Sequence, residues 1–291
     1  MIYLLLNIVF ASAFMLIIKW VQDREREDVV TVGAINYISA CLLILPGFLQ
    51  NSPGTFSLTA AMTGGTMGSC YFIAYFFVIY SIRKIGASSS TVIAVLSILL
   101  PITCGIFIWN ESPNRFQVAG IGLALLSLGL IGGNSAKIPN DITPKKPGPA
   151  WITPVVLVVF FLLAGTARLS QETFKHVSTS DQRPTFLFVA FAVAAIPSLC
   201  VLAFRRRPVL VREFVLGFAL GSANYLQTHF ILKSLQYFEG FVVFPITSAG
   251  ALILTTVIAT WLLHERLNRR TIAGIGLASV ALVLLHWLPA S

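Results

Sequence analysis

The chain has 291 residues, of which 56% are hydrophobic and 11% are charged. About a quarter of the residues of a soluble domain are charged, so the composition excludes an ordinary soluble protein and indicates a membrane protein. The formal net charge of +9 does not indicate a nucleic-acid partner, because almost all the basic residues lie in short connectors between apolar runs, as in membrane proteins.

Apolar runs of about 20 residues, the length that a helix needs to cross a bilayer, recur along the whole chain. They lie at 3–21, 30–49, 58–80, 87–109, 115–133, 152–174, 185–204, 213–235, 240–263 and 270–288. The first run lacks the basic start and the small-residue cleavage site of a secretory signal, so we expect it to stay as a helix. The predicted fold class is an all-α integral membrane protein with ten transmembrane helices.

The four cysteines lie inside apolar runs and show no Cys-x-x-Cys spacing. Neither a disulfide framework nor a zinc site is therefore expected, and no motif indicates another metal or a cofactor.

A hexapeptide, Ala-Gly-Ile-Gly-Leu-Ala, occurs at 119–124 and again at 273–278, which is 154 residues later. The same offset brings Glu111 onto Glu265, Arg115 onto Arg269 and Tyr71 onto Tyr225. The chain is therefore interpreted as a duplication. The two predicted repeats are 1–133 and 151–291, joined by a linker at 134–150 that holds four prolines and three lysines, and together they form one integrated transport domain.

Each repeat contains five predicted helices, so the second enters the membrane from the side opposite to the first, as an inverted-topology repeat. The charges agree with this arrangement. Fifteen Lys and Arg residues flank the connectors after helices 1, 3, 5, 7 and 9, and four lie on the other side. The positive-inside rule makes the richer side cytoplasmic and predicts that both termini lie outside.

Ten helices in two halves, with a glutamate before the repeated Ala-Gly-Ile-Gly-Leu-Ala run in each half, resemble the drug/metabolite transporter superfamily, in its EamA-like branch. The resemblance implies a central cavity lined by helices 1–4 and 6–9, alternating access, and helices 5 and 10 at the periphery. It also implies cargo drawn from amino acids, nucleotide sugars, phosphorylated metabolites or drugs. The location implied is the cell membrane, multi-pass, and the inner membrane if the source is a Gram-negative bacterium.

The sixth predicted helix carries ionisable residues, which are costly in hydrocarbon unless they pair or face water. Arg168 and Glu172 are four residues apart on one face and are predicted to form an ion pair, with Gln171 close by. Two interpretations remain open: the pair lines the cavity, or it snorkels to the interface.

The eighth predicted helix carries a second group of polar residues, and at the repeat offset of 154 its Tyr225 and His229 correspond to Tyr71 and Tyr75 of the third helix. So many hydrogen-bonding side chains would find no partners in lipid. We therefore interpret the two helices, together with residues of the second helix, as walls of the cavity. The predicted substrate-binding residues are Asn224, Tyr225, Thr228 and His229, then Tyr71 and Tyr75, then Asn36 and Tyr37, beside Arg168, Gln171 and Glu172.

Pro101 lies about fifteen residues into the fourth predicted helix and is expected to disrupt the turn before it. Ser97 is therefore a further candidate binding residue, although a plain kink explains the proline equally well. Several glycines, among them Gly64, Gly68 and Gly221, are interpreted as places where helix backbones approach closely. Glu111 is expected to form a turn-fixing salt bridge or a helix cap near Arg115.

The predicted function is secondary transport of a small polar metabolite, anionic or zwitterionic, such as an amino acid. The alternative is efflux of lipophilic cationic drugs, which would need an unpaired membrane carboxylate. Catalysis is disfavoured because the spans hold no aspartate and no His-Glu-x-x-His motif. The expected partners are the cargo and the lipid bilayer. A proton is a candidate coupling ion, taken up by His229 or Glu172.

Overall fold

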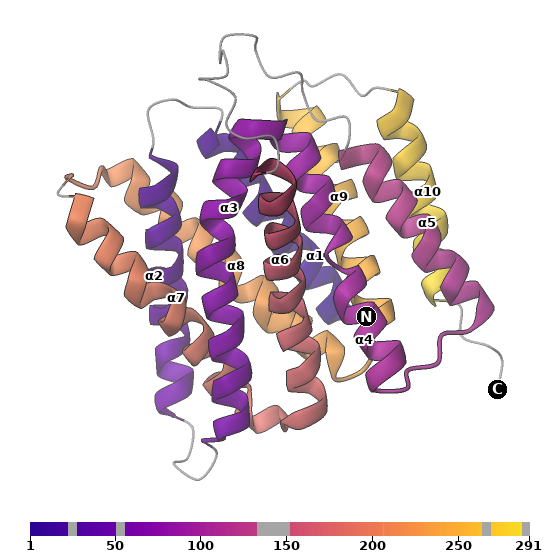
Figure 1. Ribbon diagram of the computed structural model, residues 1–291, viewed down its shortest axis with the longest axis horizontal. Helices are drawn as coiled ribbons and strands as arrows, with labels where there is room; N and C mark the ends of the chain where they lie inside the picture. Colours follow the sequence, from indigo (N-terminus) through magenta and orange to yellow (C-terminus); the bar gives the residue numbers. More distant parts are fainter. Residues whose placement is uncertain (23–27, 51–55, 133–151, 206, 264–268, 287–291) are drawn as a thin grey trace.

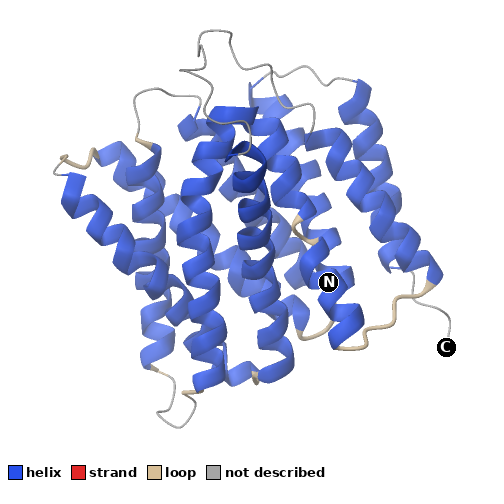
Figure 2. Ribbon diagram, in the orientation of Figure 1, coloured by secondary structure: helices blue, strands red, loops and turns tan. Residues whose placement is uncertain are grey.

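The computed structural model describes residues 1–22, 28–50, 56–132, 152–205, 207–263 and 269–286, and within these ranges the fold is entirely helical (Figures 1 and 2). The predicted linker at 134–150 and Glu265 lie outside the described residues. Ten α-helices and one short 3-10 helix occur in the described ranges, which confirms the all-α class and the predicted number of helices.

The helices follow one another in a single upright bundle. Their bounds are α1 Ile2–Gln22, α2 Val29–Leu49, α3 Leu58–Leu96, α4 Leu99–Ile108, α5 Arg115–Gly132, α6 Ile152–Val177, η2 Ser180–Gln182, α7 Arg183–Arg205, α8 Val211–Leu235, α9 Gly240–Leu263 and α10 Arg269–His286. In Figure 1, α5 and α10 lie side by side at one edge of the bundle, where the family resemblance implied them.

The predicted boundary between the third and fourth helices is wrong. Instead of a break near residues 81–86, helix α3 continues to Leu96, and the break falls at Ser97 and Ile98. Pro101 explains the position, because a proline ring clashes with the carbonyl four residues earlier, which is that of Ser97. The disruption expected before Pro101 is therefore confirmed. It separates a helix of 39 residues, α3, from one of 10 residues, α4.

Five of the described helical segments are long and apolar enough to cross a membrane. They are Ile2–Val21, Val29–Leu49, Val155–Val177, Ser180–Arg205 and Gly240–Ile258. Helix α8 is long but falls outside this group, because it carries polar residues such as Asn224, Gln227 and Lys233. A helix that turns such residues toward other helices needs less apolar surface than one that faces lipid on all sides.

Glycines let two pairs of helices touch backbone to backbone, as the sequence predicted. On α3, a methyl group added at Gly68 would collide with the carbonyl oxygen of Ala190 on α7. On α8, one added at Gly221 would lie 2.5 Å from the carbonyl oxygen of Asn36 on α2. Such contacts suit lipid, where helix association depends on close packing and not on exclusion of water.

The turn after α4 positions an acidic side chain. Asn110 has a positive φ of 55°, a conformation that asparagine tolerates better than most residues, and it ends the helix. The Glu111 backbone N–H then donates to the carbonyl of Gly105 at 3.0 Å, which folds the chain back toward the bundle. Asn114 begins α5 by accepting hydrogen bonds from the backbone N–H groups of Phe116 and Gln117, both at 2.9 Å.

Candidate transport site

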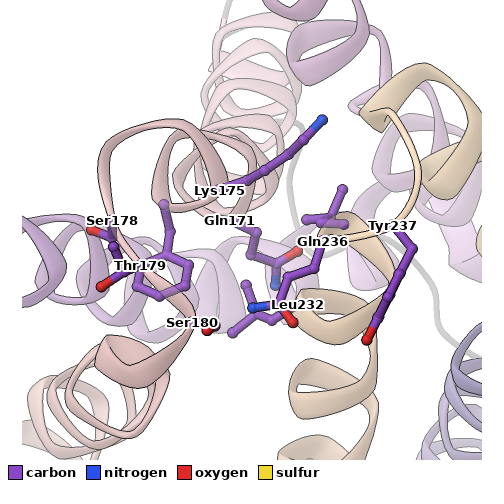
Figure 3. Close-up of a pocket in the computed structure, with 10 residues that line it drawn as sticks. Gln171, Lys175, Ser178, Thr179, Ser180, Leu232, Gln236 and Tyr237 are labelled. Carbon is purple, nitrogen blue, oxygen red and sulfur yellow. The ribbon is translucent and has the colours of Figure 1, made fainter.

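A cavity of about 480 Å³ lies between the last turns of α6 and α8 (Figure 3). Its wall combines polar and apolar side chains in about equal measure, and Lys175 is the charged residue among those that line it. The lining residues are Gln171, Phe174, Lys175, Ser178, Thr179, Ser180, Leu232, Leu235, Gln236 and Tyr237. In Figure 3 the amides of Gln171 and Gln236 point into this space, whereas the ammonium group of Lys175 points away from it. The cavity can therefore hold a small polar molecule.

Gln171 links the cavity to a deeper polar group contributed by three helices. Its amide N–H donates to the Tyr71 hydroxyl of α3 at 3.3 Å, and its carbonyl oxygen is buried without a hydrogen-bond partner among the described residues. The Thr228 hydroxyl of α8 is also within hydrogen-bonding reach of Tyr71, and the Arg168 guanidinium acts on Tyr71 electrostatically. The structure thus brings together four of the predicted binding residues: Arg168, Gln171, Tyr71 and Thr228.

Arg168 lies on the same face of α6 as Gln171 and Lys175, one turn deeper than Gln171. Its Nη1 atom is buried and has no hydrogen-bond partner among the described residues. A guanidinium nitrogen in this position is costly unless something binds it, because an unpaired buried donor loses its water without compensation. The geometry therefore leaves an unfilled donor beside the cavity.

The predicted ion pair between Arg168 and Glu172 does not form. Glu172 Oε1 instead accepts from Lys175 Nζ at 3.4 Å and contacts His176 Nε2 at 3.2 Å. Helix geometry accounts for the choice, because an acidic residue pairs better with a base that follows it by three or four residues than with one that precedes it. Glu172 therefore belongs to a second site, separate from Arg168.

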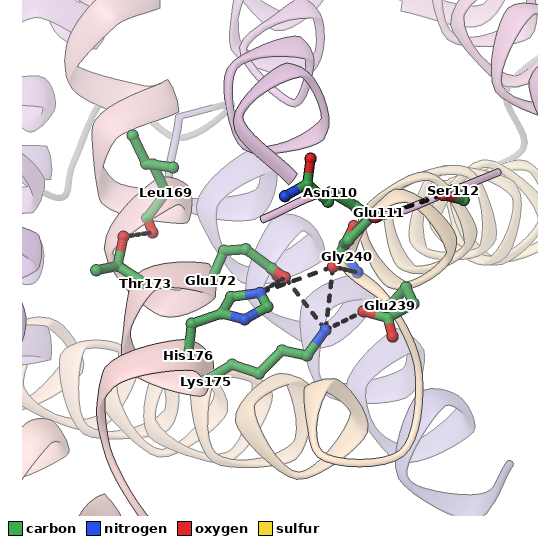
Figure 4. Close-up of polar contacts among 10 residues, drawn as sticks. All are labelled: Asn110, Glu111, Ser112, Leu169, Glu172, Thr173, Lys175, His176, Glu239 and Gly240. Atoms are coloured by element: carbon green, nitrogen blue, oxygen red, sulfur yellow. Dashed lines mark hydrogen bonds and ion pairs between the residues drawn. The ribbon is translucent and has the colours of Figure 1, made fainter. Parts of the chain in front are cut away.

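This second site is a cluster of charges at the end of α6, defined by Glu111, Glu172, Lys175, His176 and Glu239 (Figure 4). Lys175 Nζ lies 3.1 Å from Glu111 Oε1 and also pairs with Glu239, in the turn between α8 and α9. The cluster thus joins three parts of the chain. In the same place the Trp109 indole stacks on the His176 ring, with centroids 4.5 Å apart.

Glu111 forms a salt bridge, as predicted, but its partner is Lys175 of α6 and not the neighbouring Arg115. The Arg115 guanidinium lies over the Phe116 ring, 5.4 Å from its centroid. Burial alone would raise the pKa of Glu111, but the charge of Lys175 and the hydrogen bond that it donates lower the pKa below its ordinary value. Glu111 is therefore ionised at neutral pH, and it ties the α4–α5 connector to the second half of the chain.

Other predicted binding residues brace helices against one another. Asn224 Nδ2 donates to Asn36 Oδ1 at 3.2 Å, which joins α8 to α2 inside the bundle, and Gln227 Nε2 donates to Asn224 Oδ1 at 3.1 Å. Asn7 Nδ2 of α1 donates to the backbone carbonyl of Gln227 at 2.6 Å. Both asparagines of the α2–α8 pair are buried, so they form a structural contact and not a wall of the described cavity.

Tyr37 and Tyr75 lie toward the opposite end of the bundle from the cavity. The Tyr37 hydroxyl donates to the backbone carbonyl of Tyr71 at 3.1 Å, and the two rings of Tyr37 and Tyr75 meet edge to face. The Tyr75 hydroxyl donates to the carbonyl of Val29, at the start of α2. The close approach of its ring to the backbone requires glycine at position 33.

Charged residues close this opposite end, at which α2 and α8 begin and α7 ends. Asp28 pairs with Arg205, and Arg207 Nη2 lies 2.9 Å from the fully buried Glu213. Burial alone would raise the pKa of Asp28, but the hydrogen bond from Thr31 and the charge of Arg205 lower it. Asp28 is therefore ionised, and its bond to α7 forms a contact across the two halves of the chain.

Two further candidates, Ser97 and His229, make other contacts. The Ser97 hydroxyl donates to the carbonyl of Ala94 at 2.6 Å and is fully buried at the break before α4, so it completes the kink. The His229 ring lies between those of Tyr225, at 5.8 Å, and Phe230, at 5.4 Å. Its Nδ1 atom is buried without a hydrogen-bond partner in the described part of the chain.

The residues at the rim of the cavity were not predicted from the sequence. Ser178, Thr179 and Ser180 form a polar run that could have been noticed, because three hydroxyl residues follow the last turn of α6. Gln236 and Tyr237 gave no comparable signal, because they stand in an ordinary short connector. Glu239 was missed for the same reason.

The chain is similar to one protein family in sequence and to a solved structure in fold. Residues 1–133 match the model of the EamA-like transporter family. An "Uncharacterized protein" of Haemophilus influenzae is 25% identical over 196 residues, a match that covers 66% of this chain and 64% of the relative. A solved structure described as "Crystal structure of protein" is 14% identical, covers 98% of this chain and 95% of its own, and superposes with a TM-score of 0.72.

The fold and the site define a helical membrane protein with a polar cavity and buried charges between its helices. The match of residues 1–133 to the EamA-like transporter family agrees with the resemblance predicted from the repeated motif.

Proposed function

We propose that the protein is a secondary transporter that moves a small polar metabolite, anionic or zwitterionic, such as an amino acid, by alternating access. The observation that carries the proposal is the buried Arg168 Nη1 atom, which has no hydrogen-bond partner among the described residues and lies one helical turn from the cavity-lining Gln171. A guanidinium group can hold a carboxylate or a phosphate by two parallel hydrogen bonds. Gln171, Tyr71 and Thr228 would hold the remaining polar groups of the cargo.

The proposal includes two inverted five-helix repeats, with ten transmembrane helices in all, and the pattern of helix contacts supports it. Helices α1 to α4 of the first predicted repeat correspond to α6 to α9 of the second, and contacts between these helices of the two repeats have equivalents. Helix α3 packs on α6 as α8 packs on α1, α2 packs on α8 as α7 packs on α3, and α4 packs on α6 as α9 packs on α1. The family match also covers the span of the first predicted repeat. Duplicated halves of this kind can exchange an open and a closed end around a fixed site.

Alternating access needs one end of the bundle to be open while the other is closed. One end holds the cavity between α6 and α8. The other is closed by the Asp28–Arg205 pair, the Arg207–Glu213 pair and the hydroxyl of Tyr75 on Val29. The arrangement is that of a transporter open on one side, which is the outside if the charge bias sets the orientation.

Efflux of lipophilic cations is supported less well. Such a cargo needs a free carboxylate in the cavity, but Glu172 is engaged by Lys175 and His176. The charged residue in the cavity wall is instead the cation Lys175, and the cation Arg168 lies one helical turn deeper on α6 than the lining residue Gln171. Like charges repel most strongly where water is scarce, so a cationic cargo is disfavoured at this position.

A thermal-stability screen of the purified protein tests the cargo class. Amino acids and other small carboxylates are expected to raise the unfolding temperature, because a ligand at 100 times its dissociation constant stabilises the folded state by ~2.7 kcal/mol. Compounds that stabilise should then accumulate unchanged in proteoliposomes. Stabilisation by tetraphenylphosphonium but by no carboxylate would favour the drug-efflux alternative and contradict the proposal.

The orientation gives a separate prediction. With the native cysteines replaced, a single cysteine at Ser180 on the cavity rim is expected to react in intact cells with a thiol reagent that cannot cross membranes, whereas one at Arg207 is expected to react only after permeabilisation. Both positions are exposed, so accessibility of the side chain itself does not bias the comparison. The reverse labelling pattern would mean that the cavity opens to the cytoplasm.

A further inference from the structure

The charge cluster at the end of α6 borders the cavity through Lys175, but the proposed binding of cargo by Arg168 assigns no role to its buried carboxylates. We propose that the Glu172 carboxylate is a proton-binding site that couples cargo movement to a proton gradient. The inference rests on the proposed transport function and adds the coupling ion to it.

The cluster holds more negative than positive charge. Three carboxylates, those of Glu111, Glu172 and Glu239, face the single ammonium group of Lys175, and the His176 imidazole adds a positive charge only when it is protonated. Glu172 is fully buried, and the Glu111 side chain is 3% exposed. Buried charge without compensation is expensive, so an added proton stabilises the arrangement.

Hydrogen bonding points to the same conclusion independently. Glu111 Oε2 and Glu172 Oε2 are both buried, and neither has a hydrogen-bond partner among the described residues. Glu172 Oε2 points toward Gly240, where a methyl group would collide with it. A carboxylate oxygen that has lost its water and receives no donor is destabilised in its ionised form, and it gains most by holding a proton.

Of the three carboxylates, Glu172 is the one best placed to hold this proton. The Glu239 side chain is 52% exposed and keeps contact with water. Glu111 accepts from Lys175 and from the backbone N–H of Gly240, at the positive end of α9. Glu172 lies close to the C-terminal end of α6, where the helix dipole disfavours negative charge.

A proton fits the cluster better than a divalent metal ion. Ligand atoms of Glu111, Glu172 and His176 lie within 4.8 Å of one another, which is suitable spacing for a metal. The Lys175 ammonium group, however, lies 3.1 Å from the Glu111 oxygen and 3.4 Å from the Glu172 oxygen, and would repel a cation placed between them. Protonation of Glu172 needs no displacement of Lys175.

The test is infrared difference spectroscopy of the purified protein in lipid, without cargo and with a chelator, between about pH 9 and about pH 6. Ordinary carboxylates, with pKa values near 4, stay ionised throughout this interval. The wild-type protein is expected to gain a carboxylic-acid C=O band on acidification. Glu172→Gln is expected to lose that band, and Glu213→Gln, which alters a fully buried glutamate at the other end of the bundle, is expected to keep it.

Glu172→Asp guards against a folding artefact, because it keeps a titratable carboxyl and should retain a shifted band. Absence of the band in the wild-type protein, or its persistence in Glu172→Gln, would overturn the proposal. The measurement uses no cargo. A negative result therefore leaves transport of the cargo standing, whereas a failed cargo screen leaves the proton site standing.

Discussion

Replacing Arg168 by lysine is expected to weaken cargo binding by ~1.5–3 kcal/mol, or about 10- to 150-fold in dissociation constant, because hydrogen bonds to charged groups contribute this much. Lysine keeps the positive charge but cannot place two parallel N–H donors on a carboxylate. Affinity is measured by calorimetry with the cargo that the thermal screen identifies. The unfolding temperature without cargo is measured in parallel.

Arg115→Lys is the matched control for this substitution. Arg115 lies at the start of α5, over the Phe116 ring, and is not one of the residues that line the cavity, so the change should leave affinity as it is. If Arg168→Lys lowers the unfolding temperature but leaves the affinity of the folded protein unchanged, Arg168 is a structural residue that braces α6. That outcome would remove the observation on which the proposed cargo class rests.

Gly68→Ala in α3 and Gly221→Ala in α8 are each expected to destabilise the folded protein by about 1–3 kcal/mol, the usual cost of overpacking. The added methyl group would meet backbone atoms, of Ala190 in the first case and of Asn36 in the second. A backbone carbonyl inside a helix cannot rotate away, so the two helices must separate. Thermal unfolding in detergent, followed by loss of helical signal or by aggregation, measures the effect.

Neighbouring glycines supply the controls. A methyl group at Gly65 would touch the Val189 side chain at 3.8 Å, an ordinary contact, and one at Gly122 or Gly276 would meet nothing within 4 Å. Alanine at these three positions should be neutral or stabilising by up to about 1 kcal/mol, because glycine is the poorer helix former. Equal destabilisation at Gly65 and Gly68 would show that α3 tolerates no substitution here, and not that its backbone touches α7.

The two glycine contacts illustrate what the sequence could predict. A run of about 20 apolar residues identifies a helix because the bilayer sets its length, and glycines four apart identify a face along which helices approach. The repeated Ala-Gly-Ile-Gly-Leu-Ala run indicated the family in the same way, since it is a local pattern. In the structure the first glycine of that run, Gly120, packs against Leu285 of α10, and the next, Gly122, faces open space.

Partner choice among the charged residues could be decided only by the tertiary structure. Glu111 and Glu239 each lie 64 residues from Lys175 along the chain, and the order of the helices gives no reason to expect them at one point. From the sequence, Arg168 was the natural partner of Glu172. The bundle instead places Lys175 and His176 around Glu172 and leaves Arg168 beside Tyr71, because the energy of a buried charge depends on every group that replaces its water, and those groups come from whichever helices pack there.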